Sequence, residues 1–120
     1  MSCGCLKMSH GELKIAEILS KNNMSYVMEK TFADCIFPDT NCAARFDFYV
    51  NNTYCIEFDG IQHFYPTRGQ QALEETKKRD LIKNEWCKNH NIPLIRIPYT
   101  HFKNIEIEDL KLETSSFIVK

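Results

Sequence analysis

Two alternating segments, separated by three turn-forming residues, constrain this sequence more than any other feature. Residues 45–50 (RFDFYV) and 54–59 (YCIEFD) each alternate between apolar and polar side chains, and Asn51-Asn52-Thr53 lies between them. Strict alternation indicates a half-buried β-strand, and a short break between two such strands predicts a β-hairpin. The chain is therefore expected to contain an antiparallel strand pair with one apolar and one polar face.

The length of the turn decides which side chains share a face. A three-residue loop pairs Val50 with Tyr54 and gathers the apolar residues on one side. They are Phe46, Phe48, Val50, Tyr54, Ile56 and Phe58. A two-residue loop would instead place Asp47 beside Ile56 and mix the faces. In the three-residue register Asp47 lies opposite Glu57, and Asp59 follows on the same face, together with Arg45, Tyr49 and Cys55.

Three carboxylates on one hairpin face call for a physical reason. Like charges directly opposite in a sheet are destabilising. Three close carboxylates would therefore repel one another unless one of them takes up a proton. A divalent cation removes this repulsion, and Mg²⁺ binds through one or two carboxylates, waters and phosphate oxygens. The alternative is an ordinary solvated face of an amphipathic hairpin. Because Asp and Glu are poor strand formers, we expect Asp47, Glu57 and Asp59 to be metal ligands.

The segments before the hairpin predict a helix and a strand. Ser9 and Glu12 form a capping box that opens a helix ending near Leu19 or Ser20. Its expected apolar face consists of Leu13, Ile15, Ala16, Ile18 and Leu19. Residues 26–32 are predicted to be a strand. Residues 33–44, which contain Pro38 and Asp39-Thr40-Asn41, are predicted to be a loop.

The segments after the hairpin predict a crossover. A helix is expected over about residues 71–90, and the apolar run over residues 92–97 (IPLIRI) is expected to be a buried strand. Leu73, Leu81, Ile82, Trp86 and Cys87 would pack this helix on the sheet. Strand, helix and strand in this order predict parallel strands. The expected fold is α/β, with a mixed sheet of about four strands flanked by helices. The tail, residues 101–120, holds a short helix or edge strand.

Composition limits the function classes. The chain has 120 residues, enough for one domain, and a net charge of −1, which argues against a strongly basic nucleic-acid-coating module. No apolar run approaches the roughly 20 residues of a membrane span, and no secretory signal is recognisable. We therefore expect an intracellular protein. Six cysteines occur without a CxxC pair, so Cys3 and Cys5 are expected to be free thiols, and a structural zinc protein is the weakest reading.

One run of residues carries a resemblance to a known family. Phe46-Asp47, the stretch 56–63 (IEFDGIQH) and a following helix with Asp80 and Lys83 resemble the restriction-endonuclease-like PD-(D/E)xK superfamily. Within it, the chain is similar to the branch of very-short-patch-repair endonucleases and phage homing endonucleases with an EDxHD-type site. The resemblance covers roughly residues 9–99. It implies a three-layer α/β/α fold and Mg²⁺-dependent hydrolysis of double-stranded DNA. Mn²⁺ would substitute for Mg²⁺, with no organic cofactor, in a bacterial or phage-infected cell.

The resemblance also implies roles for individual residues. Asp47 matches the metal-binding strand aspartate, and either Glu57 or Asp59 falls at the (D/E)xK signature, whose lysine is missing here. His63 fits the histidine of the branch, which would activate water or protonate the leaving oxygen. Lys83 is an alternative source of the missing positive charge.

Two further catalytic candidates are weaker matches, and the positive charges suggest a DNA contact surface. Glu12 matches a helical glutamate of the branch, although capping explains it equally well, and Asp80 is a single-residue match. The expected nucleic-acid contacts are Arg45, Gln62, Lys77, Lys78, Arg79, Lys83 and Arg96.

The expected organisation is a nuclease catalytic domain over residues 9–120. Residues 1–8 resemble the end of an upstream DNA-binding or zinc segment, and a complete chain is the equal alternative. The competing functions are a catalytically inactive nucleic-acid-binding or assembly module of the same fold, and a mismatch-repair or junction-resolving nuclease. Double-strand cutting would need paired subunits, so a homodimer is a further expectation.

Overall fold

The first helix begins where the capping box predicts. α1 spans His10–Lys21. The Ser9 side chain accepts a hydrogen bond from the backbone N of Glu12 at 3.2 Å, and the Glu12 carboxylate accepts one from the backbone N of Ser9 at 2.8 Å. The buried face of α1 is narrower than predicted, because Ile15 and Leu19 are fully buried while Leu13 is 50% exposed.

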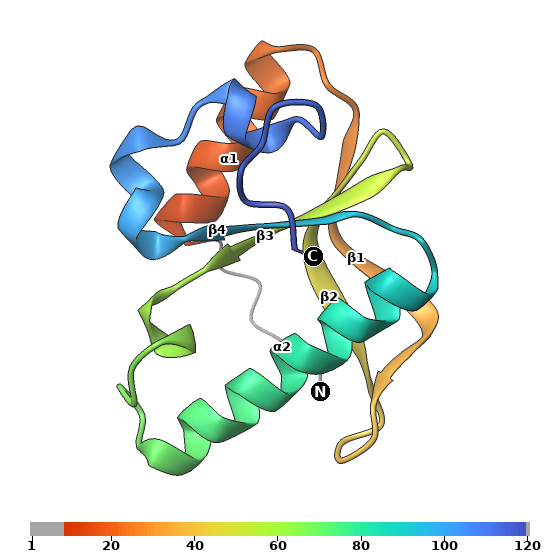
Figure 1. Ribbon diagram of the computed structural model, residues 1–120, viewed down its shortest axis with the longest axis vertical. Coiled ribbons are helices and arrows are strands. Elements are labelled where there is room, and N and C mark those ends of the chain that lie inside the picture. The colour runs from red at the N-terminus through yellow and green to blue at the C-terminus, as the bar shows by residue number, and fades with distance from the viewer. Residues whose placement is uncertain (1–8, 120) are drawn as a thin grey trace.

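The computed structural model describes residues 9–119 (Figure 1). The predictions for residues 1–8 lie outside them.

The hairpin forms in the predicted register. β2 (Cys42–Val50) and β3 (Tyr54–Asp59) are antiparallel. Val50 pairs with Tyr54 across the three-residue turn, and the next two residue pairs continue the ladder. Asn51 and Asn52 have φ of 51° and 52°, a left-handed conformation that asparagine adopts more readily than most residues. The turn residues therefore fix the register.

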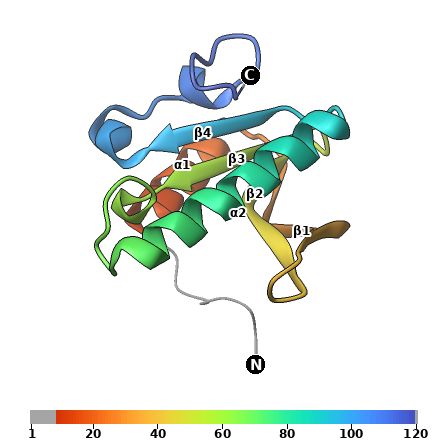
Figure 2. The same ribbon diagram turned by 60° about the horizontal axis from the view of Figure 1, so that its bottom comes forward.

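The sheet has four strands and is mixed. β1 (Tyr26–Phe37) pairs antiparallel with β2, and β4 (Leu94–Pro98) pairs parallel with β3, giving the order β1-β2-β3-β4. α2 (Gln70–Asn89) connects β3 to β4, which confirms the predicted crossover. The two helices lie on opposite faces of this sheet (Figures 1 and 2). The predicted α/β architecture is thus confirmed.

The predicted loop over residues 33–44 is wrong at both ends. β1 continues to Phe37 and β2 begins at Cys42, so that only a short turn separates them. The pairing of β1 with β2 shifts between Thr31 and Ile36. This irregularity interrupts the alternation of side chains there, and the polar turn signals around Pro38 extended the loop prediction too far in both directions.

Each face of the sheet carries its own core. On the α1 side the buried residues include Ile15, Leu19, Phe48, Val50 and Ile56. On the α2 side they include Cys35, Cys55, Cys87 and Leu94, which confirms that Cys55 and Cys87 are core residues.

Phe46 departs from the prediction. It packs in the α2-side core beside Trp86, with ring centroids 6.2 Å apart. It does not join Phe48 and Val50 on the α1 side. Leu81, predicted to pack α2 on the sheet, is 58% exposed.

The C-terminal tail covers the outer edge of β4. Two 3₁₀ segments, Tyr99–Asn104 and Ile107–Leu110, follow β4. Phe117 and Val119 then exchange backbone hydrogen bonds with β4, since Arg96 N donates to Phe117 O at 3.1 Å and Val119 N donates to Leu94 O at 2.8 Å. Within residues 9–119, no helix has both the length and the apolar character needed to cross a membrane.

Candidate active site

Two carboxylates replace backbone pairing where β2 and β3 separate. The described ladder between these strands begins at the turn and extends to Phe48 and Ile56. One residue further, the backbone N of Asp47 donates to Glu57 Oε2 at 2.7 Å, and the backbone N of Phe58 donates to Asp47 Oδ2 at 2.8 Å. Each carboxylate thus bonds the backbone of the opposite strand. This exchange fixes both side chains and coincides with the turning of Phe46 toward α2.

Lys83 of α2 supplies a cation to this carboxylate pair. Its Nζ lies 2.6 Å from Glu57 Oε1, and the two side chains are only 14% and 5% exposed. The amine also lies 5.2 Å from the centroid of the Phe46 ring. The Glu57-Phe58-Asp59 run has no lysine at the signature position. A lysine from a helix more than twenty residues further along the chain supplies a positive charge there instead.

Glu12 brings a third carboxyl to the same place from α1. While one of its oxygens caps the helix at Ser9, its carboxyl lies close enough to Asp47 to raise the pKa of that group through hydrogen bonding and charge. The capping and site roles, which the sequence left as alternatives, are therefore geometrically compatible. Gly11 makes this approach of α1 to β3 possible, because a Cβ at that position would lie 2.4 Å from the Phe58 ring.

This crowding changes the acidity of Asp47. Burial raises the pKa of its carboxyl well above the ordinary value, and the charge of Glu57 and the hydrogen bond and charge of Glu12 raise it further. The hydrogen bond from the Phe58 backbone N acts in the opposite direction. A proton or a cation at this point would relieve the repulsion among the carboxylates.

Asp59 does not join the other two strand carboxylates. Arg96 of β4 donates from Nη1 to Asp59 Oδ1 at 2.8 Å, from Nε to Asn84 Oδ1 at 2.9 Å and from Nη2 to the backbone O of Asp80 at 3.3 Å. The predicted trio is thus divided, with Asp47 and Glu57 in one group and Asp59 in another. Asp59 turns away because a buried guanidinium on the neighbouring parallel strand attracts it.

His63 belongs to this second group. Its Nδ1 donates to Asp80 Oδ2 at 2.8 Å and lies 3.7 Å from Asp59 Oδ1. Burial lowers the pKa of the imidazole, but the hydrogen bond and charge of Asp80 and the charge of Asp59 outweigh it, so that the pKa is raised. Within residues 9–119 the Nε2 atom forms no hydrogen bond, which leaves it available to a bound molecule.

The second group has the spacing of a metal site. Asp59, His63 and Asp80 each offer a ligand atom, and these atoms lie within 4.8 Å of one another. The Arg96 guanidinium already neutralises part of this charge, since its Nη1 is 2.8 Å from Asp59 and 3.6 Å from Asp80. Burial raises the pKa of Asp59, and the charges of Arg96 and His63 offset this rise in part.

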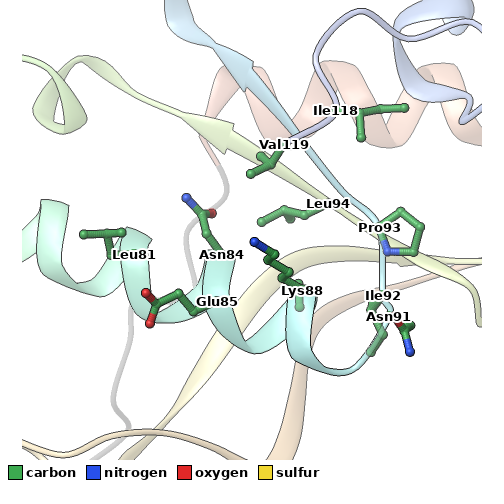
Figure 3. Close-up of a pocket in the computed structure, with 11 residues that line it drawn as sticks. Leu81, Asn84, Glu85, Lys88, Asn91, Ile92, Pro93, Leu94, Ile118 and Val119 are labelled. Atoms are coloured by element: carbon green, nitrogen blue, oxygen red, sulfur yellow. The ribbon is translucent and has the colours of Figure 1, made fainter.

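A pocket of about 330 Å³ is lined by the first group and by His63 of the second. Glu12, Asp47, Glu57, His63 and Lys83 all line it, so five of the seven predicted catalytic residues meet in one hollow. A larger hollow of about 590 Å³ lies elsewhere, between the second half of α2, β4 and the C-terminal tail (Figure 3). None of the predicted catalytic residues lines it.

The predicted nucleic-acid contacts separate into three classes. Arg45 and Gln62 line the carboxylate pocket together with Lys83. Lys77 and Lys78 are exposed on α2 and line none of the described hollows, whereas Arg79 borders a neighbouring groove. Arg96 is engaged inside the domain and is 12% exposed, so its assignment as a phosphate contact is not supported.

Two features of the site were missed from the sequence. Arg68 borders the same groove as Arg79, and its position in a polar connection gave no periodic signal. The pairing of His63 with Asp80 joins residues 17 positions apart on different elements, which no local pattern reveals.

Comparisons of the chain with protein-family models, with curated proteins and with solved structures return no match.

Proposed function

We propose that this chain is a metal-dependent endonuclease that hydrolyses DNA phosphodiester bonds. The observation that carries the proposal is the pairing of Asp47 and Glu57 on neighbouring strands with Lys83 at 2.6 Å from Glu57. Two strand carboxylates and one amine are the elements that the PD-(D/E)xK resemblance requires. The amine reaches the site from α2, and this supports an active enzyme over a module that has lost its lysine.

The donor set fits a hard divalent cation. Mg²⁺ binds through one or two carboxylates and keeps several waters, and Asp47 and Glu57 offer two such groups in one pocket. Burial is the main cause of the raised pKa of Asp47, and the charges of Glu57 and Glu12 add to it; a cation would offset these charges. When bound, Mg²⁺ or Mn²⁺ would neutralise charge on the phosphate and acidify a bound water. Asp59, His63 and Asp80 form a second position for a metal. A cation is less needed there, because the Arg96 guanidinium already offsets part of the carboxylate charge.

The side chains of the pocket divide the remaining work. Lys83 is held beside Glu57, where its positive charge would offset negative charge that develops on the phosphate. His63 moves a proton through Nε2, while Asp80 holds the Nδ1–H and thereby orients the ring. Arg96 fixes Asp59 and the backbone of Asp80, so it acts as a positioning residue.

A plasmid assay tests this proposal. Supercoiled DNA should be nicked or linearised with Mg²⁺ or Mn²⁺ and left intact with EDTA, and Asp47→Ala should abolish cutting while the protein stays folded by circular dichroism. Glu85→Ala is the matched control, since Glu85 is an exposed carboxylate on α2 outside the carboxylate pocket. If Asp47→Ala cuts like the wild type, the site is misassigned. If the wild type cuts with neither ion, the binding-module alternative replaces the enzyme.

Substrate form separates the remaining alternatives. A homing-type enzyme should cut plain duplex DNA, a repair nuclease should prefer mismatched duplexes, and a resolvase should prefer branched junctions. Comparing the three substrates at equal concentration decides among them. Gel filtration of the same preparation tests the homodimer that double-strand cutting would need.

A further inference from the structure

A second hollow adjoins the carboxylate pocket. This groove has a volume of about 510 Å³ and lies between α2 and the β1–β2 hairpin, with Phe37 and Thr40 on one wall and Thr76 and Arg79 on the other. It shares four lining residues with the carboxylate pocket. They are Arg45, Gln62, His63 and Lys83. A chain-like ligand could therefore pass from one hollow to the other without leaving the surface.

The sign of the charge reverses between the two hollows. Four carboxylates border the pocket, namely Glu12, Glu29, Asp47 and Glu57. The groove has one, Asp80, which is already bonded by His63. Four cationic side chains border the groove, namely Arg45, Arg68, Arg79 and Lys83. A polyanion would thus be attracted to the groove and would need a cation to enter the pocket.

Two of the four groove cations are not engaged in a short ion pair within residues 9–119. Lys83 is committed to Glu57 at 2.6 Å and Arg45 to Glu29 at 2.8 Å. Arg79 is 3.6 Å from an exposed Asp39 carboxylate, a surface pair that contributes little. Arg68 is exposed and makes no ion pair within residues 9–119. Arg68 and Arg79 are therefore the groove residues best able to accept a phosphate.

The surroundings of Arg79 hold its guanidinium in a defined position on the groove wall. Its guanidinium lies 5.1 Å from the centroid of the Phe37 ring, on the wall of the same groove. Its Nε is buried and has no hydrogen-bond partner within residues 9–119. A guanidinium held over an aromatic ring keeps a defined orientation. Because the Arg79 side chain is still 42% exposed, a phosphate in the groove can reach it.

We infer that this groove binds the phosphodiester backbone of the DNA strand that is cut, with phosphates next to the scissile one on Arg68 and Arg79. The inference rests on the proposed function and adds the path of the strand to it. It also separates the three consecutive basic residues 77–79, because Arg79 borders the groove and Lys77 and Lys78 do not. Charge position, and not charge number, then decides DNA affinity.

Two double variants of equal charge change test the inference. Binding of a fluorescein-labelled duplex is measured by anisotropy in EDTA, for Arg68→Ala/Arg79→Ala and for Lys77→Ala/Lys78→Ala. The groove variant should bind at least about 10-fold more weakly, and its salt slope should fall by about 2, close to one per lost phosphate contact. The lysine variant should bind within about 2-fold of the wild type, since neither lysine lines the groove and salt screens exposed charges that make no direct contact. Equal effects of the two variants would overturn the inference.

Further variants keep the result interpretable. Arg68→Ala alone should weaken binding by about 3- to 10-fold with a salt slope lower by about 1, and among residues 9–119 Arg68 makes no ion pair whose loss could disturb the fold. Asp47→Asn should keep the groove-dependent binding while losing cleavage. Loss of binding in the groove variants of a protein that never cuts DNA would reject the nuclease but keep the groove. A nuclease whose groove variants bind normally would reject the groove alone.

Discussion

The ion pair between Lys83 and Glu57 should dominate the stability of the metal-free site. Its two side chains are 14% and 5% exposed and their charged atoms are 2.6 Å apart. Lys83→Met leaves the Glu57 carboxylate buried beside Asp47 without its cation. Removing one partner of a buried pair typically costs about 3–5 kcal/mol. Because a domain of this size loses about 4 °C in Tm per kcal/mol, we expect a fall of at least about 12 °C at pH 8 in EDTA.

A double-mutant cycle separates the pair from the loss of the lysine itself. Glu57→Gln added to Lys83→Met removes the buried charge, so the double variant should recover to within about 1 kcal/mol of the wild type. The coupling free energy should then be at least about 2 kcal/mol, as expected for residues in direct contact. The measurement is urea unfolding followed by circular dichroism.

The outcome that refutes this reasoning is specific. If Lys83→Met costs less than about 1 kcal/mol, or if the double variant is no more stable than Lys83→Met, the pair does not compensate a buried charge. Lys78→Met is the control, since it makes the same chemical change on an exposed position of α2 and should stay within about 0.5 kcal/mol.

Three further predictions concern single side chains. Because the raised pKa of Asp47 means that its ionised form is disfavoured in the folded state, Asp47→Asn should raise stability in EDTA at pH 8 by about 1 kcal/mol while abolishing cleavage. A lower Tm would contradict this. His63 has a raised pKa, so its contribution is complete below about pH 6.5 and is lost as the pH rises through the folded-state pKa. The deficit of His63→Gln in urea unfolding should therefore be larger at pH 6 than at pH 9, and a constant deficit would refute the linkage. Gly11→Ala should destabilise the protein by about 1–3 kcal/mol, since its Cβ would meet the Phe58 ring at 2.4 Å. Gly60→Ala is the control, because the three atoms nearest to its Cβ all belong to the flexible end of Gln62, and equal losses in the two variants would reject the overpacking argument.

Local sequence patterns predict the hairpin well because its information is local. The Asn51-Asn52-Thr53 turn and two alternating strands determine the register, and the structure places Val50 opposite Tyr54. The same holds for the capping box of α1, whose two hydrogen bonds involve residues three apart. The crossover helix was also predicted to within a residue at each end.

The site was only half predictable because its key contacts are long-range. The pairing of Asp47 with Glu57 follows from the hairpin register, but the position of Asp59 depends on Arg96, which the parallel strand β4 places beside it. Strand alternation alone put all three carboxylates on one face. It could not show that side chains replace the backbone ladder at Asp47, nor that Phe46 packs in the core on the α2 side.

The net charge of −1 takes a different meaning once the charges have positions. Carboxylates predominate in the pocket and cationic side chains in the adjoining groove, so a near-zero sum conceals an uneven distribution of charge. Under the proposed function, a divalent ion would offset the pocket on site, and the groove would then face the DNA as a positive surface. Arg96 does not contribute to that surface, since its guanidinium is paired with the carboxylates of Asp59 and Asp80. With few free cations, the domain alone should hold DNA weakly and release it readily as salt rises. Tight binding would therefore need a second subunit or a further DNA-binding segment.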